Sequence, residues 1–401
     1  MSAWLSVVGI GEDGLAGLPP AARALVDGAE VLVGGDRHLA MIPADGRERR
    51  VWGSPLSALV EEIAGRRGQR VCVLATGDPM AYGIGVTLAR HIPPPEMTIV
   101  PAPSAFSLAA ARLGGGLAEV ECLTLHGRPL EMLHPFVQPG ARLLLLANDG
   151  ATPGQVASLL RARGYGDSRL SVLAHMGGPR ETVTEGHARD WGESPGPDFN
   201  TIAVACVASP DAPLLPRGPG LPDEAFQNDG QLTKREVRAV TLAALAPISG
   251  QHLWDVGAGC GSVAIEWLRA ARNTTATAVE RRADRAALIA ANAAALGTPS
   301  LDIVTGEAPA ALSDLPSPDA VFVGGGLARE DLFDFCWERL RPGGRLVANA
   351  VTVQGEAALA DWHGRNCGAL TRLAISRAAP VGGLTGWRPL MPVTQLAARK
   401  P

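Results

Sequence analysis

Short apolar runs alternate with amphipathic stretches through the first half of the chain, which is the pattern of an α/β fold. Buried strands are predicted at residues 4–10, 71–75, 97–100 and 142–147. Helices are predicted at residues 55–67 and 152–163, where apolar positions recur at helical spacing. Three more strands follow at residues 170–174, 181–184 and 201–207, with little helical sequence between them. We therefore expect an α/β lobe followed by a lobe with more antiparallel sheet.

The alternation is more regular in the second half. Strands are predicted at residues 252–256, 275–279, 301–304, 320–323 and 345–350. Helices are predicted at residues 234–246, 262–272, 283–296 and 330–340. Repeated strand–helix units are joined by right-handed crossovers, so this half is expected to be a doubly wound, Rossmann-like parallel sheet. The last two strand candidates, at 371–377 and 389–396, are expected to form a terminal hairpin.

The segment between the two halves is rich in proline. Its prolines recur at every third position, at Pro210, Pro213, Pro216, Pro219 and Pro222. This period matches polyproline II, which would make a semi-rigid spacer, although an irregular loop is the alternative. Few core contacts are expected to cross such a segment. The chain of 401 residues is therefore expected to divide into a domain of residues 1–207, a linker of 208–228 and a domain of 229–401.

The composition limits the partners of the chain. Its net charge is −4 and it has no block of Lys or Arg, which does not favour a nucleic-acid partner. No apolar run approaches the ~18 residues of a membrane span, and no charged region precedes the first apolar run, so neither a membrane partner nor a signal peptide is expected. Six cysteines without a C-x-x-C pair are expected to be reduced thiols of a cytoplasmic protein, not metal ligands. They are Cys72, Cys122, Cys206, Cys260, Cys336 and Cys367.

A glycine-rich turn joins the first strand of the second half to the helix that follows it. It consists of Gly257, Ala258, Gly259, Cys260 and Gly261. Glycines permit positive φ there and let a ligand approach the backbone. A dinucleotide fingerprint would be G-x-G-x-x-G, but here the spacing is G-x-G-x-G, and Ser262 stands where the third glycine would be. The spacing favours S-adenosylmethionine (SAM), which has no pyrophosphate, and a merely tight turn is the alternative.

Three further segments of this half lie at the ends of predicted strands. Glu280 ends the second strand, where a carboxylate can accept hydrogen bonds from both ribose hydroxyls of SAM; a solvated glutamate is the alternative. Glu307 and Ala308 follow the third strand, where an adenine ring would lie. The fourth strand runs into three glycines at 324–326. Because open α/β sheets bind ligands at the carboxyl ends of their strands, these segments predict one SAM site.

Three cations lie in or beside the first turn of the helix predicted at 234–246: Lys234, Arg235 and Arg238. Thr233 and Glu236 have the spacing of a capping box, which would start this helix at Thr233. Cations at a helix N-terminus oppose the helix dipole, each by about 0.3–1 kcal/mol. We interpret them as an anion site for a carboxylate-rich substrate, and solvated side chains on an exposed turn are the alternative.

Small, flexible segments also follow three predicted strands of the first half. The first is residues 8–14, with the sequence Val-Gly-Ile-Gly-Glu-Asp-Gly. The other two contain Gly77, Asp78 and Pro79, and then Pro103, Ser104 and Ala105. Each segment alone is consistent with an ordinary turn. Together they outline a pocket that is lined by backbone.

Both halves resemble known methyltransferase families. The first-half segments, with Leu-His-Gly-Arg at 125–128, resemble the tetrapyrrole (corrin/porphyrin) methylase family across residues 1–207. The second half, through residues 233–238, 306–309 and 341–345, resembles the class I decarboxylating precorrin methyltransferases across 229–401. A fusion in this order is similar to the bifunctional precorrin methyltransferases of cobalamin biosynthesis.

The resemblance implies two SAM sites, one in each domain, and no metal. In the first domain SAM would bind between two lobes, at the segments around Gly77 and Ser104, and in the second Thr233 would join the cofactor residues. The implied substrate is a precorrin, a tetrapyrrole. The first half would methylate C5, and the second would methylate C15 and release a ring acetate as carbon dioxide. A homo-oligomer is also expected, and no catalytic side chain is assigned.

One departure from the family pattern and three other functions remain open. Many tetrapyrrole methylases carry Gly-x-Gly-Pro-Gly in the first loop, where this chain has Glu12 and Asp13, so the role of this loop is open. The chain could instead methylate another small molecule. A nicotinamide-dependent reductase would also use a glycine loop and Glu280, although the glycine spacing disfavours it. A SAM-binding protein without enzymatic activity is the third alternative.

Overall fold

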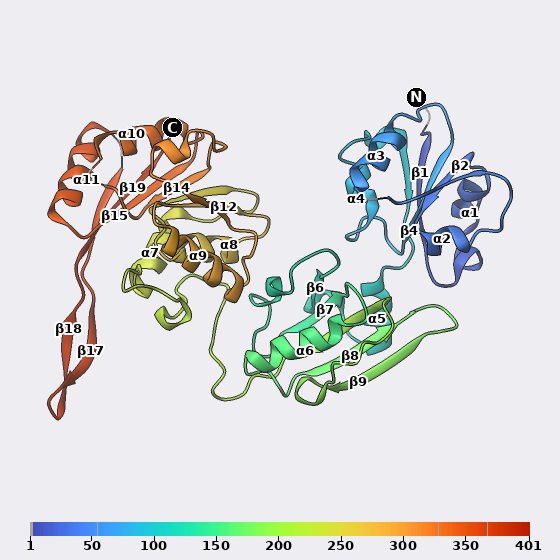
Figure 1. Ribbon diagram of the computed structural model, residues 1–401, viewed down its shortest axis with the longest axis horizontal. Coiled ribbons are helices and arrows are strands. Elements are labelled where there is room, and N and C mark those ends of the chain that lie inside the picture. The colour runs from blue at the N-terminus through green and yellow to red at the C-terminus, as the bar shows by residue number, and fades with distance from the viewer. Residues whose placement is uncertain (1–2, 54, 328, 367) are drawn as a thin grey trace. The chain divides into compact units, whose positions relative to one another are not determined.

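The computed structural model describes residues 3–53, 55–327, 329–366 and 368–401, and Cys367 lies outside these residues. The chain forms two compact units (Figure 1). The first holds the residues up to 128 together with 139–213, and the second holds 129–138 and 214–401. The fold class expected from the sequence, a two-lobed α/β half followed by a doubly wound half, is confirmed.

The first lobe of unit 1 is a five-stranded parallel sheet with the order β3-β2-β4-β1-β5. Its strands are β1 (Leu5–Ile10), β2 (Val31–Gly34), β3 (Glu48–Val51), β4 (Val71–Thr76) and β5 (Met97–Val100). Its helices are α1 (Pro20–Asp27), α2 (Asp36–Ala40), α3 (Leu56–Ala64) and α4 (Ile84–Leu88). The central strands β1 and β4 are buried on both faces, which explains why they read as continuous apolar runs.

The second lobe of unit 1 is a mixed sheet with the order β6-β7-β10-β8-β9. Only β6 and β7 pair in parallel, as expected for a lobe that is mainly antiparallel. Its strands are β6 (Glu121–Thr124), β7 (Arg142–Leu146), β8 (Arg169–Ala174), β9 (Thr182–His187) and β10 (Asn200–Ala205). The helices of this lobe are α5 (Ala105–Leu113) and α6 (Thr152–Ala162).

Unit 2 is a seven-stranded sheet with the order β13-β12-β11-β14-β15-β19-β16. Its parallel strands are β11 (His252–Val256), β12 (Thr275–Glu280), β13 (Asp302–Thr305), β14 (Ala320–Val323) and β15 (Arg345–Ala350). Its helices are α7 (Arg235–Leu245), α8 (Ser262–Ala270), α9 (Ala283–Ala295), α10 (Glu330–Arg339) and α11 (Val353–Arg365). Helices α7, α8 and α9 cover one face of the sheet, and α10 and α11 cover the other (Figure 1). The strand order changes direction between β11 and β14, which is where such sheets bind ligands.

The C-terminal strands differ in part from the expectation. Strands β16 (Ala369–Leu373) and β19 (Val393–Arg399) do pair antiparallel, with Thr371 opposite Gln395. Between them, however, the chain forms a separate hairpin of β17 (Ser376–Val381) and β18 (Leu384–Pro389), which extends away from the sheet (Figure 1). The residues of this hairpin are mostly exposed on both faces, so they lack the alternation that would have predicted two strands.

The proline-rich segment is not a free spacer along its whole length. From Leu214 onward the chain packs on unit 2, where Leu215, Leu221 and Phe226 are buried in the core. The carbonyl oxygen of Leu215 also accepts a 2.8 Å hydrogen bond from Arg269 of α8. The apolar residues between the prolines therefore determine how this segment packs. Residues 214–228 of the expected linker form part of the second unit.

We predict that the second unit needs this segment for stability. Each buried Leu or Phe side chain contributes about 1.5–3 kcal/mol, so a fragment of residues 214–401 should unfold at a clearly higher temperature than one of residues 229–401. Thermal unfolding followed by circular dichroism measures the difference. Equal unfolding temperatures would mean that Leu215, Leu221 and Phe226 do not stabilise the sheet.

Candidate functional site

A cavity of about 840 Å³ opens at the carboxyl ends of the strands of unit 2. Most of the residues predicted for the second-half site line it. These are Thr233, Lys234, Gly257, Ala258, Gly259, Cys260, Glu280, Glu307 and Ala308. They come from the loops after β11, β12 and β13 and from the chain before α7. Residues as far apart in the sequence as Thr233 and Ala308 therefore lie at one site.

The floor of this cavity is made of two glycine loops in close contact. Gly257 has φ +70°, and a Cβ atom there would lie 2.9 Å from the backbone nitrogen of Gly325. A side chain on Gly257 therefore does not fit between the loops, and the cavity floor at this point is bare backbone. Gly261 has a different role from the one predicted, because it is not among the lining residues. A Cβ on Gly261 would lie 2.8 Å from Ile289, so this glycine allows α9 to pack against the loop.

Glu280 is a buried carboxylate at the end of β12. One of its oxygens accepts a 3.0 Å hydrogen bond from the backbone N–H of Gly259, and the other accepts one of 3.0 Å from the N–H of Arg282. The two bonds fix the side chain, which is only 4% exposed, at the edge of the cavity. Each oxygen has two lone pairs, so each retains one that can accept a hydrogen bond from a ligand.

Asp255 and Cys260 are buried titratable groups beside the glycine loop. Asp255 accepts a 2.9 Å hydrogen bond from the N–H of Ala264 through one oxygen only. Burial raises the pKa of Asp255 to about 7, and the nearby charge of Glu280 adds to this effect. Burial also raises the pKa of the Cys260 thiol, which is therefore protonated at neutral pH. The Cys260 thiol therefore adds no charge to the site, and Asp255 carries less than a full negative charge at neutral pH.

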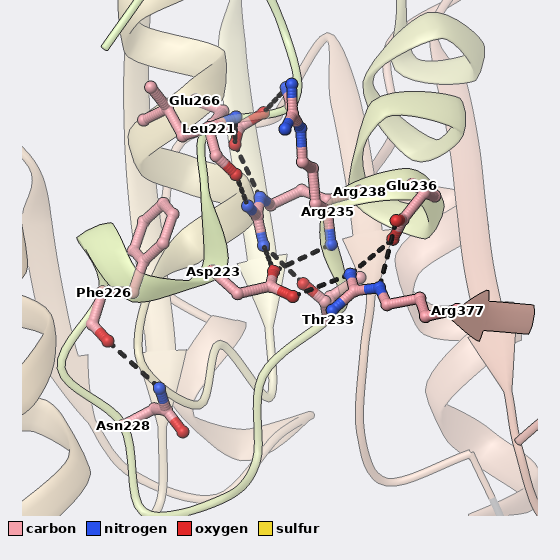
Figure 2. A network of polar contacts seen from close by, with 11 residues as sticks. Leu221, Asp223, Phe226, Asn228, Thr233, Arg235, Glu236, Arg238, Glu266 and Arg377 are labelled. Carbon is pink, nitrogen blue, oxygen red and sulfur yellow. Dashed lines mark hydrogen bonds and ion pairs between the residues drawn. The ribbon is translucent and has the colours of Figure 1, made fainter. Parts of the chain in front are cut away.

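The three cations predicted to bind substrate carboxylates lie in different surroundings, and Figure 2 shows two of them, Arg235 and Arg238. Lys234 lines the cavity, and Arg235 is exposed beside it without lining it. Arg238 is fully buried. Its Nε atom donates a 2.6 Å hydrogen bond to Glu266, and its other nitrogens donate to the carbonyl oxygens of Leu221 and Thr233. The predicted role of Arg238 in substrate binding is therefore wrong, because every face of its guanidinium is already engaged.

The capping box predicted at Thr233 is also wrong. Helix α7 begins at Arg235, with Lys234 as the N-cap and no side-chain hydrogen bond to the cap. The carboxylate of Glu236, which would have closed the box, instead accepts hydrogen bonds from Arg377 of the hairpin at 2.6 and 3.1 Å. Long-range ion pairs therefore outweigh the local capping pattern.

Several residues that line the cavity were not predicted from the sequence. Asn349, at the end of β15, donates a 2.8 Å hydrogen bond to Thr241 and accepts one of 2.9 Å from Gln395. Leu390 and Met391 follow the hairpin and form an apolar wall. A polar residue inside the apolar run 345–350 is a signal that could have identified Asn349. No such signal exists for Leu390 and Met391, because their position depends on the hairpin.

In unit 1 the predicted segments meet at one edge of the parallel sheet. The N–H of Ala102 donates a 3.2 Å hydrogen bond to the carbonyl oxygen of Gly77. A Cβ on Gly77, which has φ +58°, would lie 2.9 Å from the carbonyl oxygen of Pro103. The side chains have local partners, since Asp78 accepts from the N–H of Met80 at 2.8 Å and Ser104 caps α5. Pro79 and Ala105 belong to the same two turns.

Glu12 joins the two lobes of unit 1. Its carboxylate forms an ion pair with Arg37 of α2 and contacts Nδ1 of His175, after β8, at 3.1 Å. A third partner, Arg180, lies 3.5 Å away. Burial alone would raise the pKa of Glu12, but the hydrogen bond from His175 and the charge of Arg37 outweigh it and lower this pKa. The departure from the family's glycine-rich first loop thus places an ionised carboxylate between the lobes.

His38 is the neutral neighbour of this cluster. Its Nε2 atom lies 2.9 Å from the hydroxyl of Thr76, at the end of β4. Burial and the charge of Arg37 lower the pKa of His38 to about 4. At neutral pH the imidazole is therefore uncharged, and Arg37 supplies the positive charge that faces Glu12.

Among the residues that the structure describes, no group of three His, Cys, Asp or Glu side chains could hold a metal ion. In the same part of the chain, no helix is both long and apolar enough to cross a membrane.

Two family models match the chain, one in each half. The model of the tetrapyrrole (corrin/porphyrin) methylases matches residues 5–191. The model of the precorrin methyltransferase domain matches residues 224–400. The two matches therefore leave residues 192–223 between them.

Curated relatives include both fused and separate proteins. A Sinorhizobium protein named precorrin-6Y C(5,15)-methyltransferase [decarboxylating] is 49% identical over 396 residues, 98% of this chain and 96% of its own length. Cobalt-precorrin-7 C(5)-methyltransferase of Salmonella typhimurium is 36% identical over 42% of this chain and 83% of its own length. Cobalt-precorrin-6B C(15)-methyltransferase (decarboxylating) of the same organism is 35% identical over 42% of this chain and 89% of its own length.

We predict that Glu12 stabilises unit 1 only while it is ionised. Because its pKa is lowered in the folded protein, its contribution is present above its ordinary value of 4.5 and is lost as the pH falls through the folded-state pKa. Glu12→Gln should therefore lower stability by about 1.5–3 kcal/mol at pH 7 and by much less at pH 3. Hydrogen exchange of peptides from β1 and β8 measures this within the full chain.

Glu30→Gln is the control, because Glu30 is exposed: it forms a 3.5 Å ion pair with Arg70 and accepts a 2.7 Å hydrogen bond from the N–H of the same residue, which a glutamine oxygen can also accept. A Glu12→Gln effect of equal size at pH 7 and pH 3 would contradict the ionised role of Glu12.

Proposed function

The chain belongs to the family of decarboxylating precorrin-6Y C(5,15)-methyltransferases, and from this we propose that each of its two units binds one SAM and transfers one methyl group. It is a SAM-dependent methyltransferase that acts on a precorrin with decarboxylation. In our proposal, unit 1 methylates C5, whereas unit 2 methylates C15 and releases carbon dioxide from a ring acetate. The C5 activity would then lie in residues 1–207, and the C15 activity in residues 229–401 together with the segment 214–228 that packs on them.

The separate relatives support this division. The names of the two Salmonella proteins assign C5 methylation to one protein, and C15 methylation with decarboxylation to another. Each is matched over 42% of this chain, close to the share of one unit. The family model that covers residues 5–191 is that of the tetrapyrrole methylases, which favours unit 1 for the methylation without decarboxylation.

The cavity of unit 2 fits SAM on three counts. Its floor is the backbone of Gly257, Gly259 and Gly325, which a bulky ligand can approach closely. Glu280 presents two carboxylate oxygens with free lone pairs, as the two hydroxyls of a ribose require. At about 840 Å³ the cavity lies near the upper end of the ~300–1,000 Å³ range of small-molecule sites, which leaves room for part of a second ligand.

We assign the remaining contacts by position. The ribose would contact Glu280, the adenine would lie against Glu307 and Ala308, and the methionine part would lie over the glycine loop and Cys260, close to Thr233. Lys234 and Arg235 are the proposed partners of substrate carboxylates. In unit 1, the proposed SAM contacts are the turns of Gly77–Asp78–Pro79 and Pro103–Ser104–Ala105, mainly through main-chain groups.

The proposed methyl transfers need few catalytic side chains. SAM supplies a methyl group on a positively charged sulfur, and an electron-rich carbon of the reduced macrocycle attacks this methyl group directly. The protein then contributes by holding both molecules in line and by excluding water, effects that can replace a strong base. For the decarboxylation, the conjugated macrocycle accepts the electron pair that the departing carbon dioxide leaves behind. Lys234 is placed to orient a carboxylate at the edge of the cavity.

We predict that Glu280→Gln in the full chain separates the two activities. Wild-type protein should bind two SAM molecules in calorimetry, and the variant should bind one of them about 10–150-fold more weakly, the loss expected for a charged hydrogen bond. In mass spectrometry of the products, C15 methylation and carbon dioxide release should fall together. Glu338→Gln, at an exposed position of α10, is the control. Carbon dioxide release that persists after the second SAM site is lost would contradict the division.

We also propose that the chain forms a homo-oligomer through the β17–β18 hairpin. Val381, Leu384 and Trp387 are 64%, 80% and 77% exposed on this ribbon, and both of its edges lack a partner strand within the described residues. Apolar ribbons with open edges pair readily with further strands.

We predict that replacing Leu384 and Trp387 together by Ser lowers the mass measured by light scattering to that of a monomer. Val183→Ser, which removes a single exposed side chain on β9, should leave the mass unchanged. A monomeric wild-type protein would contradict the proposal.

A further inference from the structure

The hairpin and the start of α7 form two walls of the same cavity in unit 2. Residues 230–234 and Val237 line it on one side. Residues 389–391 and Val393, where the chain leaves the hairpin, line it on another. At the base of the hairpin, the N–H of Leu390 donates a 2.8 Å hydrogen bond to the carbonyl oxygen of Ile375. Any shift of the hairpin therefore moves a cavity wall.

Arg377 connects these two walls. It lies on β17, and its guanidinium makes a two-pronged contact with Glu236 of α7, at 2.6 and 3.1 Å. A third bond, of 2.9 Å, goes to Asp223. Figure 2 shows Arg377 reaching from the hairpin to both carboxylates. Two carboxylates on one guanidinium define its place more narrowly than a single exposed pair would.

The connection continues from Arg377 into the core. Asp223 also accepts a 2.9 Å hydrogen bond from the N–H of Arg235 and lies 3.4 Å from Arg238. Arg238 in turn is bonded to Glu266, which is 1% exposed. The hairpin is thus fixed to two buried charges, through a chain of contacts that begins at Arg377.

The walls that Arg377 connects differ in chemistry from the SAM side of the cavity. Leu390, Met391 and Val393 are apolar, which suits the flat face of a macrocycle. Lys234, at the N-cap of α7, lines the same cavity and suits a carboxylate. The proposed SAM contacts at Gly257 and Glu280 are fixed by separate backbone bonds that do not involve the hairpin.

We propose that Arg377 is a positioning residue for the tetrapyrrole in unit 2, because it holds the apolar wall and the start of α7 at the spacing that the macrocycle needs. This inference rests on the proposed function of unit 2. Arg377 touches neither ligand and acts through Glu236 and Asp223. Its loss should affect the binding of the tetrapyrrole and leave the binding of SAM unchanged.

The test compares two arginines that face each other across the hairpin. Arg377→Met removes the ion pairs and keeps the apolar stem, and Arg388→Met makes the same change at the residue directly opposite in the strand register. In the full chain, Arg377→Met should raise the KM of the C15 step for the tetrapyrrole by about 2–30-fold with a smaller change in kcat. The Kd for SAM in calorimetry should stay within about twofold. Arg388→Met should match the wild type.

Further variants separate positioning from stability. Partly exposed ion pairs contribute little to stability, so the unfolding temperature of Arg377→Met should change little while KM rises. Arg377→Lys, which keeps the positive charge, should raise KM less than Arg377→Met does. Glu236→Gln should raise KM as well, and the double variant Arg377→Met/Glu236→Gln should add little beyond either single change, because both break the same contact.

Three outcomes would overturn the inference: an unchanged KM in Arg377→Met, an equal rise in Arg388→Met, or additive effects of Arg377→Met and Glu236→Gln. A wild-type protein that binds SAM but releases no carbon dioxide from the precorrin would instead overturn the proposed function itself.

Discussion

The buried ion pair of Arg238 and Glu266 is the constraint on which unit 2 depends most. Two charges removed from water are tolerated only when their remaining hydrogen-bonding groups are satisfied. Here Glu266 also accepts the N–H groups of Gly220 and Leu221, at 2.7 and 2.9 Å, and Arg238 donates to the carbonyl oxygen of Leu221. The pair therefore joins α7 to α8 and also fixes the chain before α7 to both helices. That chain continues directly into the wall of the cavity.

The candidate sites of the two units are built from the same elements. In each, the loops at the carboxyl ends of parallel strands approach so closely that a side chain on the glycine would not fit, at Gly77 against Pro103 and at Gly257 against Gly325. The resulting surfaces consist mainly of backbone groups. Such surfaces suit a reaction in which the cofactor and the substrate bring their own reactivity, because the protein then needs geometry more than it needs acids and bases. Charged side chains such as Glu12 and Arg238 serve instead to fix the surrounding elements.

Features with a local cause were predictable from the sequence, and features with a distant cause were not. The order of strands and helices, the glycine loop at Gly257 and the position of Glu280 follow from periodicity and from the edge at which parallel strands end. The burial of Arg238 depends on Glu266, 28 residues further along, so the sequence alone led us to predict that Arg238 binds substrate carboxylates. Residues 214–228 looked like a spacer because proline dominated the pattern. The apolar residues Leu215 and Leu221, which are buried in the core of unit 2, were the signal that this segment packs on the second unit.

The close contact between Gly257 and Gly325 has a consequence for the way this protein can evolve. Gly257 cannot be replaced by a larger residue unless the facing loop moves, so very few substitutions are compatible with this part of the cavity floor. The wall at Leu390 and Met391 is different, because it follows a ribbon whose residues are mostly exposed. Substitutions can therefore change the shape of the wall more readily than the shape of the floor. With the proposed binding of SAM on the floor, a lineage with this structure can acquire new substrates and still keep its methyl donor.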